Sequence, residues 1–594
     1  MNDFITKRLE ALREVMRGEG LGAFVVPSTD PHNGEYVPAH WEARKWLTGF
    51  DGSAGTVVVT ADDAALWTDS RYFLAAEQQL EGTGIRLMKE RMPGTPDIHK
   101  WIGRKLAVAG ATSVGIDGSV CTAATVAALA EALRGEGGLT LRTNLDPFAR
   151  IWHDRPPVPD GKVEIHPMEY AGESCRVKLA RVRAALSADH IDGMLVAALD
   201  DIAWLLNLRG SDVHCNPVFV SYLLIEQERA TIYINKVKLT PRVAAYLKEE
   251  GIGVKDYADV MEGLKKYSGY NILLDAGEIN HTLYNAVRCI KINRPSPVPF
   301  MKAVKNPVEA DGFRHAMLRD GVAMVKFLRW LKPAVEQGGQ TELSVARKLD
   351  SMRAEQPLFR GISFDTISAY QEHGAIVHYE PTEATDMPLR PEGLLLLDSG
   401  AQYADATTDL TRTIALGAVT EEQRRIYTLV LKGHIQLQML KFPRGASGTQ
   451  LDAVARKDLW AEGLNFMHGT GHGVGSYLCV HEGPHQIRME WKPAPMTEGM
   501  TVTDEPGLYL AGRFGVRIEN MLLTVPYKQT GFGVFLGFET LTLCPIDTAP
   551  VIISMLTTEE RAWLNAYHKT VYDKLSPHIS ADERAWLKDA TAEI

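Results

Sequence analysis

The alternation of apolar and polar residues beyond the middle of the chain predicts a β-hairpin that carries two acidic side chains. An apolar run ends at Asp398, a turn-rich segment follows, and a polar/apolar alternation begins at Asp409. This is the pattern of two strands joined by a loop. If the hairpin folds between Tyr403 and Ala404, Asp398 lies opposite Asp409, and opposed residues of antiparallel strands point to the same face.

The stretch 501–522 repeats this pattern further along the chain. Folded about Gly512, it places Glu505 opposite Glu519. Like charges opposed on a sheet destabilise it, and crowded carboxylates cannot all ionise unless a cation compensates them. The two hairpins together therefore predict a metal site that is rich in carboxylates.

An imidazole ligand is available between the two hairpins, in the segment 468–475, HGTGHGVG. Glycine at every second position disfavours a helix and indicates an extended segment that another part of the chain approaches closely. The spacing is not that of a phosphate-binding loop. In an extended chain His468 and His472 share a face, so both are candidates for the site.

The N-terminal half of the chain predicts two related domains. From 21 to 72 the pattern is strand, loop, helix and two further strands, and a similar succession recurs from 192 to 238. A period of roughly 160 to 170 residues is far longer than that of solenoid repeats, so it indicates a domain duplication.

Proline-rich segments around 155–161 and 295–307 mark the candidate domain boundaries. A long helical pattern opens at Pro307 and continues through Leu331. We therefore expect three domains. Their ranges are 1–155, 156–306 and 307–594.

Both ends of the chain predict helices. Charged residues separate the apolar positions of the N-terminal segment, which is therefore an amphipathic helix and not a signal peptide. In the tail, Trp563 and Trp586 belong to two similar segments that each open with a capping box, and we expect both to pack on their own domain in preference to forming a subunit contact. The capping pairs are Thr557 with Glu560 and Ser580 with Glu583.

The composition is that of a soluble globular protein and excludes several classes of function. Hydrophobic residues make up 45% of the chain and charged residues 23%, and no apolar run approaches the length of about 18 residues that a membrane span needs. The net charge of -10 disfavours a nucleic-acid partner. The six cysteines have neither a disulfide-framework nor a metal-knuckle spacing, so we expect a reducing, cytoplasmic location.

The acidic strings and the histidine segment together resemble the metal site of the creatinase/methionine-aminopeptidase ("pita-bread") superfamily. Within it the chain resembles the three-domain cytosolic type of the Xaa-Pro aminopeptidase (aminopeptidase P) family, and the match covers nearly the whole chain. The strings that carry it are LLDSGAQYADATTDLTRT, HGTGHGVG, VTDEPG and RIEN, with FDGSAGT, LWTDSRYF, NLRGSDV and NPVF nearer the N-terminus. The resemblance implies an α+β chain: two related creatinase-N-like α/β domains, then a pita-bread domain of two αββ halves related by a pseudo-twofold axis.

The resemblance also implies the ligands of two divalent metal ions. Asp398 binds one ion, Asp409 and Glu519 bridge both ions, and His472 with Glu505 completes the second. The resemblance further implies that a hydroxide bridging the ions would attack the scissile carbonyl, and that Glu505 would additionally shuttle the proton. An oxygen/nitrogen ligand set suits Mn(II) first, with Co, Zn or Fe as alternatives.

Four more residues match family positions. His378, His468 and His481 resemble catalytic and substrate-positioning histidines that hold the peptide, stabilise the oxyanion and form the proline pocket. Arg517, two residues before Glu519, is expected on the same face of its strand, where it can pair with a ligand carboxylate or with the substrate.

The activity implied is release of the N-terminal residue from peptides whose second residue is proline, by a cytoplasmic homodimer. A prolidase, which cleaves X-Pro dipeptides, shares the ligands, but the two-domain N-terminal extension favours the aminopeptidase. A non-catalytic peptide-binding pita-bread protein is the second alternative, and the intact ligand set disfavours it.

Overall fold

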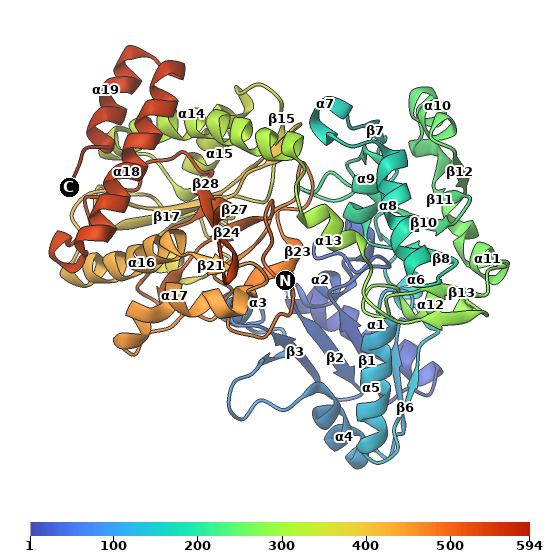
Figure 1. Ribbon diagram of the computed structural model, residues 1–594. Coiled ribbons are helices and arrows are strands. Elements are labelled where there is room, and N and C mark those ends of the chain that lie inside the picture. The colour runs from blue at the N-terminus through green and yellow to red at the C-terminus, as the bar shows by residue number, and fades with distance from the viewer. Residues whose placement is uncertain (1) are drawn as a thin grey trace. The chain divides into compact units, whose positions relative to one another are not determined.

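The computed structural model describes residues 2–594, which divide into two compact units (Figure 1). Unit 1 comprises Met1–His166 and Glu173–Val298, and unit 2 comprises Pro167–Gly172 and Pro299–Ile594. Among the residues described, no helix combines the length and the apolar character that crossing a membrane requires.

The first sheet of unit 1 has six strands in the order β4-β3-β2-β1-β5-β6. Its two faces are covered by different helices, because Phe24 and Val26 pack in the cluster that contains α1, whereas Ala23 and Val25 pack with α4 and α5. The strands are β1 (Ala23–Pro27), β2 (Thr56–Thr60), β3 (Ala64–Thr68), β4 (Arg86–Lys89), β5 (Ser113–Ile116) and β6 (Thr140–Arg142). The helices are α1 (Asn2–Gly18), α2 (Ala43–Thr48), α3 (Phe73–Gln79), α4 (Ile98–Ala109), α5 (Ala123–Gly135) and α6 (Phe148–Ile151).

The second sheet of unit 1 has the order β12-β11-β10-β8-β13-β14, which is the order of the first sheet strand for strand. The directions also agree: β1 and β8 each pair antiparallel with the next central strand and parallel with the strand on the other side. The predicted duplication is therefore confirmed. The strands are β8 (Gly193–Val196), β10 (Ser221–Glu226), β11 (Ala230–Ile234), β12 (Ile252–Lys255), β13 (Asn271–Leu273) and β14 (Ile290–Ile292). The helices are α8 (Cys175–Ala188), α9 (Leu199–Leu206), α10 (Pro241–Glu249), α11 (Val260–Lys265) and α12 (His281–Ala286).

Direct contacts join the two sheets of unit 1. The buried His32 ring lies 2.9 Å from the carbonyl oxygen of Ala197 and 2.9 Å from the Tyr257 hydroxyl. The expected boundary near 155 therefore falls inside one compact unit.

Unit 2 contains several small antiparallel sheets. Those that position the acidic residues are β16-β17-β20, β15-β18-β19, β21-β28-β27-β24, β22-β23 and β25-β26. The strands of the first acidic region are β15 (Phe359–Ile362), β16 (Ile367–Tyr370), β17 (Leu394–Ser399), β18 (Ala401–Tyr403), β19 (Ala406–Thr407) and β20 (Leu410–Ala415). Those of the second are β21 (Phe442–Pro443), β22 (Gly471–Gly473), β23 (Glu482–Ile487), β24 (Thr501–Asp504), β25 (Gly507–Leu510), β26 (Phe514–Arg517), β27 (Asn520–Thr530) and β28 (Gly533–Thr540).

Two helix pairs cover the two acidic regions. Helix α14 (Pro307–Gln337) starts at the predicted residue, with a capping box from Asn306, and continues beyond Leu331; with α15 (Glu342–Ala354) it packs on β17 and β20. Helix α17 and the end of α16 pack on β24 and β27. The bounds of these two helices are α16 (Glu421–Met439) and α17 (Gly448–Ala461). Each acidic hairpin thus has its own pair of helices, as two αββ halves require.

The tail forms the two predicted helices, α18 (Thr558–Leu575) and α19 (Ala581–Ala590). Both predicted capping boxes are present. Trp563 and Trp586 are partly buried against a large hydrophobic cluster of unit 2. The expectation that they pack on their own domain is confirmed.

Candidate metal centre

The first acidic hairpin has a register that differs from the predicted one by two residues. Asp398 at the end of β17 pairs with Thr411, not with Asp409. The reason is that β18 and β19 form an inner ladder whose turn is centred between Ala404 and Asp405. Because side chains alternate with a period of two, a shift of two residues leaves both aspartates on one face, as diagonal neighbours.

The second acidic hairpin has the predicted register. Asp504 on β24 pairs with Asn520 on β27, and the next ladder, β25 with β26, keeps the same register about Gly512. Gly512 has a φ of 69°, a left-handed turn conformation that glycine adopts without a steric penalty. Glu505 and Glu519 lie at opposed positions in the break between the two ladders, as predicted.

Hydrogen bonds join the two acidic hairpins directly. The backbone N–H of Glu519 donates to the carbonyl oxygen of Thr411 at 3.1 Å, and the Thr411 hydroxyl donates to Glu519 Oε2 at 2.8 Å. Two residues away, the Thr413 hydroxyl donates to the carbonyl oxygen of Arg517 at 2.8 Å. The acidic side chains of both hairpins are therefore held on one surface.

The glycine-rich segment is extended and closely approached, as predicted. A Cβ on Gly471 would lie 1.9 Å from the carbonyl oxygen of Thr503, and one on Gly473 would lie 2.5 Å from that of Glu482. Only glycine leaves room for these contacts. The contact of Gly471 places β22, and with it His472, directly against β24 of the second acidic hairpin, and that of Gly473 joins β22 to β23.

The ring of His472 faces the acidic residues. Its Nδ1 lies 2.9 Å from the carbonyl oxygen of Gly473, which can only accept, so Nδ1 carries a proton, and in the neutral imidazole Nε2 is the nitrogen that can bind a metal ion. Nε2 lies 3.5 Å from Asp409 Oδ2 and 3.4 Å from Glu505 Oε1. Ligand atoms of Asp409, His472 and Glu519 all lie within 4.8 Å of one another, a spacing that one cation could bridge.

Burial and mutual repulsion raise the pKa values of these acids. Burial, followed by the charges of Asp398 and Glu505, raises the pKa of Asp409 well above its ordinary range, and burial with the charge of Asp409 does the same to the pKa of Glu519. The pKa of Glu505 rises to about 7, mainly through burial. These carboxylates cannot all ionise at neutral pH without a compensating cation.

One orphaned atom supports the same conclusion. Asp398 Oδ1 is buried and has no hydrogen-bond partner, although Oδ2 of the same carboxylate is fully engaged. An unpartnered buried carboxylate oxygen is costly unless it binds a cation. Asp398, Asp409, His472, Glu505 and Glu519 therefore fit a site for divalent metal ions.

Metal-free protein is expected to lose stability as the pH rises. The pKa of Glu505 is raised from an ordinary value of 4.5 to about 7, so the folded state binds more protons than the unfolded state in this interval. The associated stability is present below the unfolded pKa and is lost as the pH rises through the folded one. Melting curves of metal-free protein should show the transition falling by a few degrees between about pH 5 and pH 8, and saturating Mn²⁺ should remove most of the fall.

A matched variant tests the cause of this pH dependence. Glu505→Gln cannot titrate, so its metal-free melting temperature should vary less with pH than that of the parent protein. Equal pH profiles for the two metal-free proteins would contradict the assignment.

Arg517 pairs with a proposed ligand carboxylate, one of its two expected partners. Its Nε and Nη2 donate to Asp398 Oδ2 at 3.1 and 2.7 Å, and its Nη1 donates to the Tyr509 hydroxyl at 2.7 Å. Tyr509 in turn lies 2.8 Å from His468 Nε2. The sequence analysis did not single out Tyr509, although its even spacing from Glu505 along the second hairpin could have indicated it.

The three other histidines have different positions. The ring of His481 lies 4.4 Å from that of His472, nearly perpendicular to it, and its charge lowers the pKa values of Asp409 and Glu505. His468 is linked to Arg517 through Tyr509. His378 lies in the turn after the short helix η4 (Gln371–Ala375), whose backbone packs against β26.

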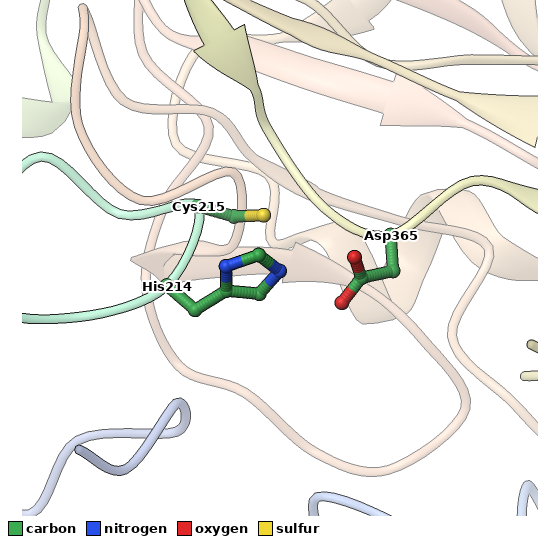
Figure 2. Close-up of side chains that lie close together, drawn as sticks. All are labelled: His214, Cys215 and Asp365. Carbon is green, nitrogen blue, oxygen red and sulfur yellow. The ribbon is translucent and has the colours of Figure 1, made fainter. Parts of the chain in front are cut away.

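A second group of possible ligands was not predicted and is drawn in Figure 2. His214 and Cys215 follow one another on a loop of unit 1, whereas Asp365 belongs to unit 2. Two adjacent side chains of one loop are too few to define a metal site within unit 1.

Comparisons with known proteins agree with the fold. Residues 311–526 match the model of metallopeptidase family M24, and 534–594 match the C-terminal region of that peptidase. Residues 8–143 and 154–309 each match a creatinase/prolidase N-terminal domain. The fold is thus that of a metallopeptidase of family M24 that carries two creatinase-type domains.

Full-length relatives define the family more closely. The chain is 38% identical to Xaa-Pro aminopeptidase 1 of Dictyostelium discoideum, over 98% of this chain and 96% of the relative. It is 36% identical to aminopeptidase P1 of Arabidopsis thaliana, over 99% of each. The crystal structure of an X-prolyl aminopeptidase of Caenorhabditis elegans, described as a cytosolic enzyme with a di-nuclear active site, matches with a TM-score of 0.95 and 34% identity, covering 99% of this chain and all of that one. The chain belongs to the Xaa-Pro aminopeptidase family.

Proposed function

We propose that this protein is a metal-dependent aminopeptidase that releases the N-terminal residue from peptides with proline in the second position. The observation that carries the proposal is the set of proposed ligands that two joined hairpins and the adjacent strand β22 bring together. Full-length similarity to Xaa-Pro aminopeptidases supplies the substrate class.

The ligands proposed for two divalent ions are Asp398, Asp409, His472, Glu505 and Glu519. The set contains oxygen and nitrogen donors and no thiolate, so it suits Mn(II). When bound, the ions would acidify a water molecule and polarise the scissile carbonyl. Arg517 orients Asp398 for this task, because its guanidinium donates to Oδ2 and leaves Oδ1, which has no hydrogen-bond partner, to bind a metal ion.

The remaining steps belong to side chains of the protein. The Glu505 carboxylate is proposed to accept a proton from the attacking water and to pass it to the proline nitrogen, which must be protonated to leave. His481 lies beside His472 and is proposed to donate a hydrogen bond to the developing oxyanion. His468, held by Tyr509, and His378 are proposed to position the peptide.

Proline at the second position imposes a particular pocket. The X-Pro bond is a tertiary amide without an N–H, so the enzyme cannot recognise it by a hydrogen bond at that atom. A surface shaped for the pyrrolidine ring must replace that contact. We propose that His468 and His481 contribute to this surface.

Domain division, location and assembly are further proposals. Three domains at 1–155, 156–306 and 307–594 are supported by the two matching sheets and by the limits of the family models. A cytoplasmic location is supported by the relative described as cytosolic. A homodimer is proposed from the family resemblance alone.

The function is tested on purified full-length protein with an X-Pro-X tripeptide. We expect release of the first residue by protein that contains about two equivalents of divalent metal, loss of activity on chelation, and recovery when Mn²⁺ is added. Activity that persists in chelated protein shown to be free of metal would overturn the proposal.

A further inference from the structure

Arg412 lies on β20 behind the acidic cluster, and only 1% of its surface is exposed. Its Nη1 donates to the carbonyl oxygens of Thr411 at 2.9 Å and Glu519 at 2.6 Å. Its Nη2 donates to Asn520 Oδ1 at 2.8 Å. One guanidinium therefore fixes the backbone at the point where the two acidic hairpins meet.

The other side of the Arg412 guanidinium is held by the C-terminal region. Nε donates to the carbonyl oxygen of Pro545 at 2.9 Å, and Nη2 also donates to the carbonyl oxygen of Cys544 at 2.8 Å and to the Tyr567 hydroxyl at 2.9 Å. The Tyr567 hydroxyl donates onward to the Cys544 carbonyl oxygen at 2.8 Å. These acceptors are neutral, so the planar fork is oriented by several directional hydrogen bonds and not by one carboxylate.

Tyr567 itself is rigidly placed. It lies on α18, which runs beside α16 (Figure 1). Glu560 of α18 accepts hydrogen bonds from Lys432 Nζ at 2.8 Å and Gln436 Nε2 at 2.7 Å, both on α16. The Tyr567 ring stacks on that of Trp563 at 5.3 Å with an interplanar angle of 7°. Because Tyr567 is held in this way, its hydroxyl is a fixed hydrogen-bond acceptor that can orient Arg412.

A second contact of α18 reaches the other arm of the second hairpin. The rings of Trp563 and His434 are perpendicular, with their centroids 6.3 Å apart. His434 Nδ1 lies 3.1 Å from Asp504 Oδ2, and Asp504 directly precedes Glu505. The same helix thus supports the backbone beside both glutamates of the hairpin.

We propose that Tyr567 is a positioning residue of the metal centre, through which α18 and Arg412 hold the backbone of Thr411 and Glu519 in the geometry that binds metal. The inference rests on the proposed role of Glu519 as a metal ligand. Thr411 also donates its hydroxyl to Glu519 Oε2, so displacement of this backbone would move both the ligand and the group that orients it. Partners that orient ligands commonly change metal affinity by about 10- to 100-fold.

The experiment is a titration of Mn²⁺ into metal-free full-length protein, followed by calorimetry. Tyr567→Phe keeps the stacked ring and removes only the hydroxyl. We expect its Mn²⁺ dissociation constant to rise about 10-fold, and kcat of the loaded enzyme to fall with little change in KM. Arg412→Lys keeps the charge but loses the fork, and its dissociation constant should rise at least as much.

Tyr427→Phe is the matched control. Tyr427 is buried in the same hydrophobic cluster and donates its hydroxyl to the carbonyl oxygen of Asp547 at 2.7 Å. It should lower the melting temperature about as much as Tyr567→Phe and leave the Mn²⁺ dissociation constant unchanged. Equal Mn²⁺ affinities for Tyr567→Phe and the parent protein, or equal losses in both tyrosine variants, would overturn the inference. A parent protein that binds no Mn²⁺ would instead refute the proposed function on which the inference rests.

Discussion

Replacing Glu519 or His472 by alanine is expected to lower kcat/KM for an X-Pro-X peptide by about 10³-fold or more. Each side chain offers a proposed ligand atom within the same small cluster. A metal ion contributes several kcal/mol of transition-state stabilisation, and each 1.4 kcal/mol corresponds to about tenfold in rate. Metal content measured beside the kinetics should show that at least one equivalent is lost.

Both variants are expected to remain folded. Neither side chain is part of a hydrophobic cluster, and removing an acid from a group of mutually repelling carboxylates relieves charge repulsion in the metal-free state. The melting temperature of the metal-free variants should therefore be close to that of the metal-free parent protein. Full activity of either variant with Mn²⁺ supplied would rule out its role as a ligand.

His481→Ala is the control that separates loss of a ligand from a change beside the site. Its ring lies 4.4 Å from that of His472, yet it is not among the proposed ligands. We expect it to retain the metal and to lower kcat by about 10²-fold, as the loss of one oxyanion donor does. His378→Ala should likewise lower turnover without emptying the site. Loss of metal from His481→Ala would mean that the ligand set is wrongly assigned.

The two hairpins show which parts of the site can be predicted from sequence. The register of the second hairpin follows from one glycine turn at Gly512, so counting outward from that turn pairs Glu505 with Glu519 correctly. The first hairpin contains an inner ladder whose turn cannot be located by symmetry, so its register was wrong by two residues. The face was nevertheless right because the error was even.

The domain duplication was predictable for a different reason. The order of strands and helices is a local property, and both sheets repeat it along the chain. The hydrogen bonds that hold the backbone of the metal centre, by contrast, join residues far apart in the sequence. Tyr567 and Arg412 are 155 residues apart, and their contact exists only because α18 packs on the rest of unit 2. No spacing in a single sequence indicates such a pair.

For the histidines too, local sequence patterns were predictive and long-range contacts were not. His472 belongs to a strand in which glycine alternates with other residues, and this alternation predicted the close approach of the strand to another part of the chain. The contact between His468 and Tyr509 joins residues 41 positions apart, on segments that meet only in the folded unit. The sequence therefore identified the histidines, whereas their hydrogen-bond partners, Tyr509 among them, came from the structure.

Substrate preference is the second large effect expected. We expect cleavage of X-Pro dipeptides and of longer X-Pro-X peptides, cleavage of X-Ala peptides reduced by about 10²-fold or more, and no detectable cleavage of N-acetylated peptides. The free amine of the substrate is cationic and can donate hydrogen bonds to carboxylate oxygens of the acidic cluster. Acetylation removes that charge and adds bulk at the same point.

The panel also separates this proposal from its two rivals, because each rival predicts a different pattern of cleavage. Residues beyond proline can add binding energy but take no part in the bond that breaks, so longer peptides should react at least as well as dipeptides in kcat/KM. Activity confined to dipeptides would indicate a prolidase, whose site must exclude the continuing chain. Protein that binds two metal ions but cleaves no X-Pro bond would indicate a peptide-binding protein, since an intact ligand set is necessary for this hydrolysis but does not by itself supply the proline pocket.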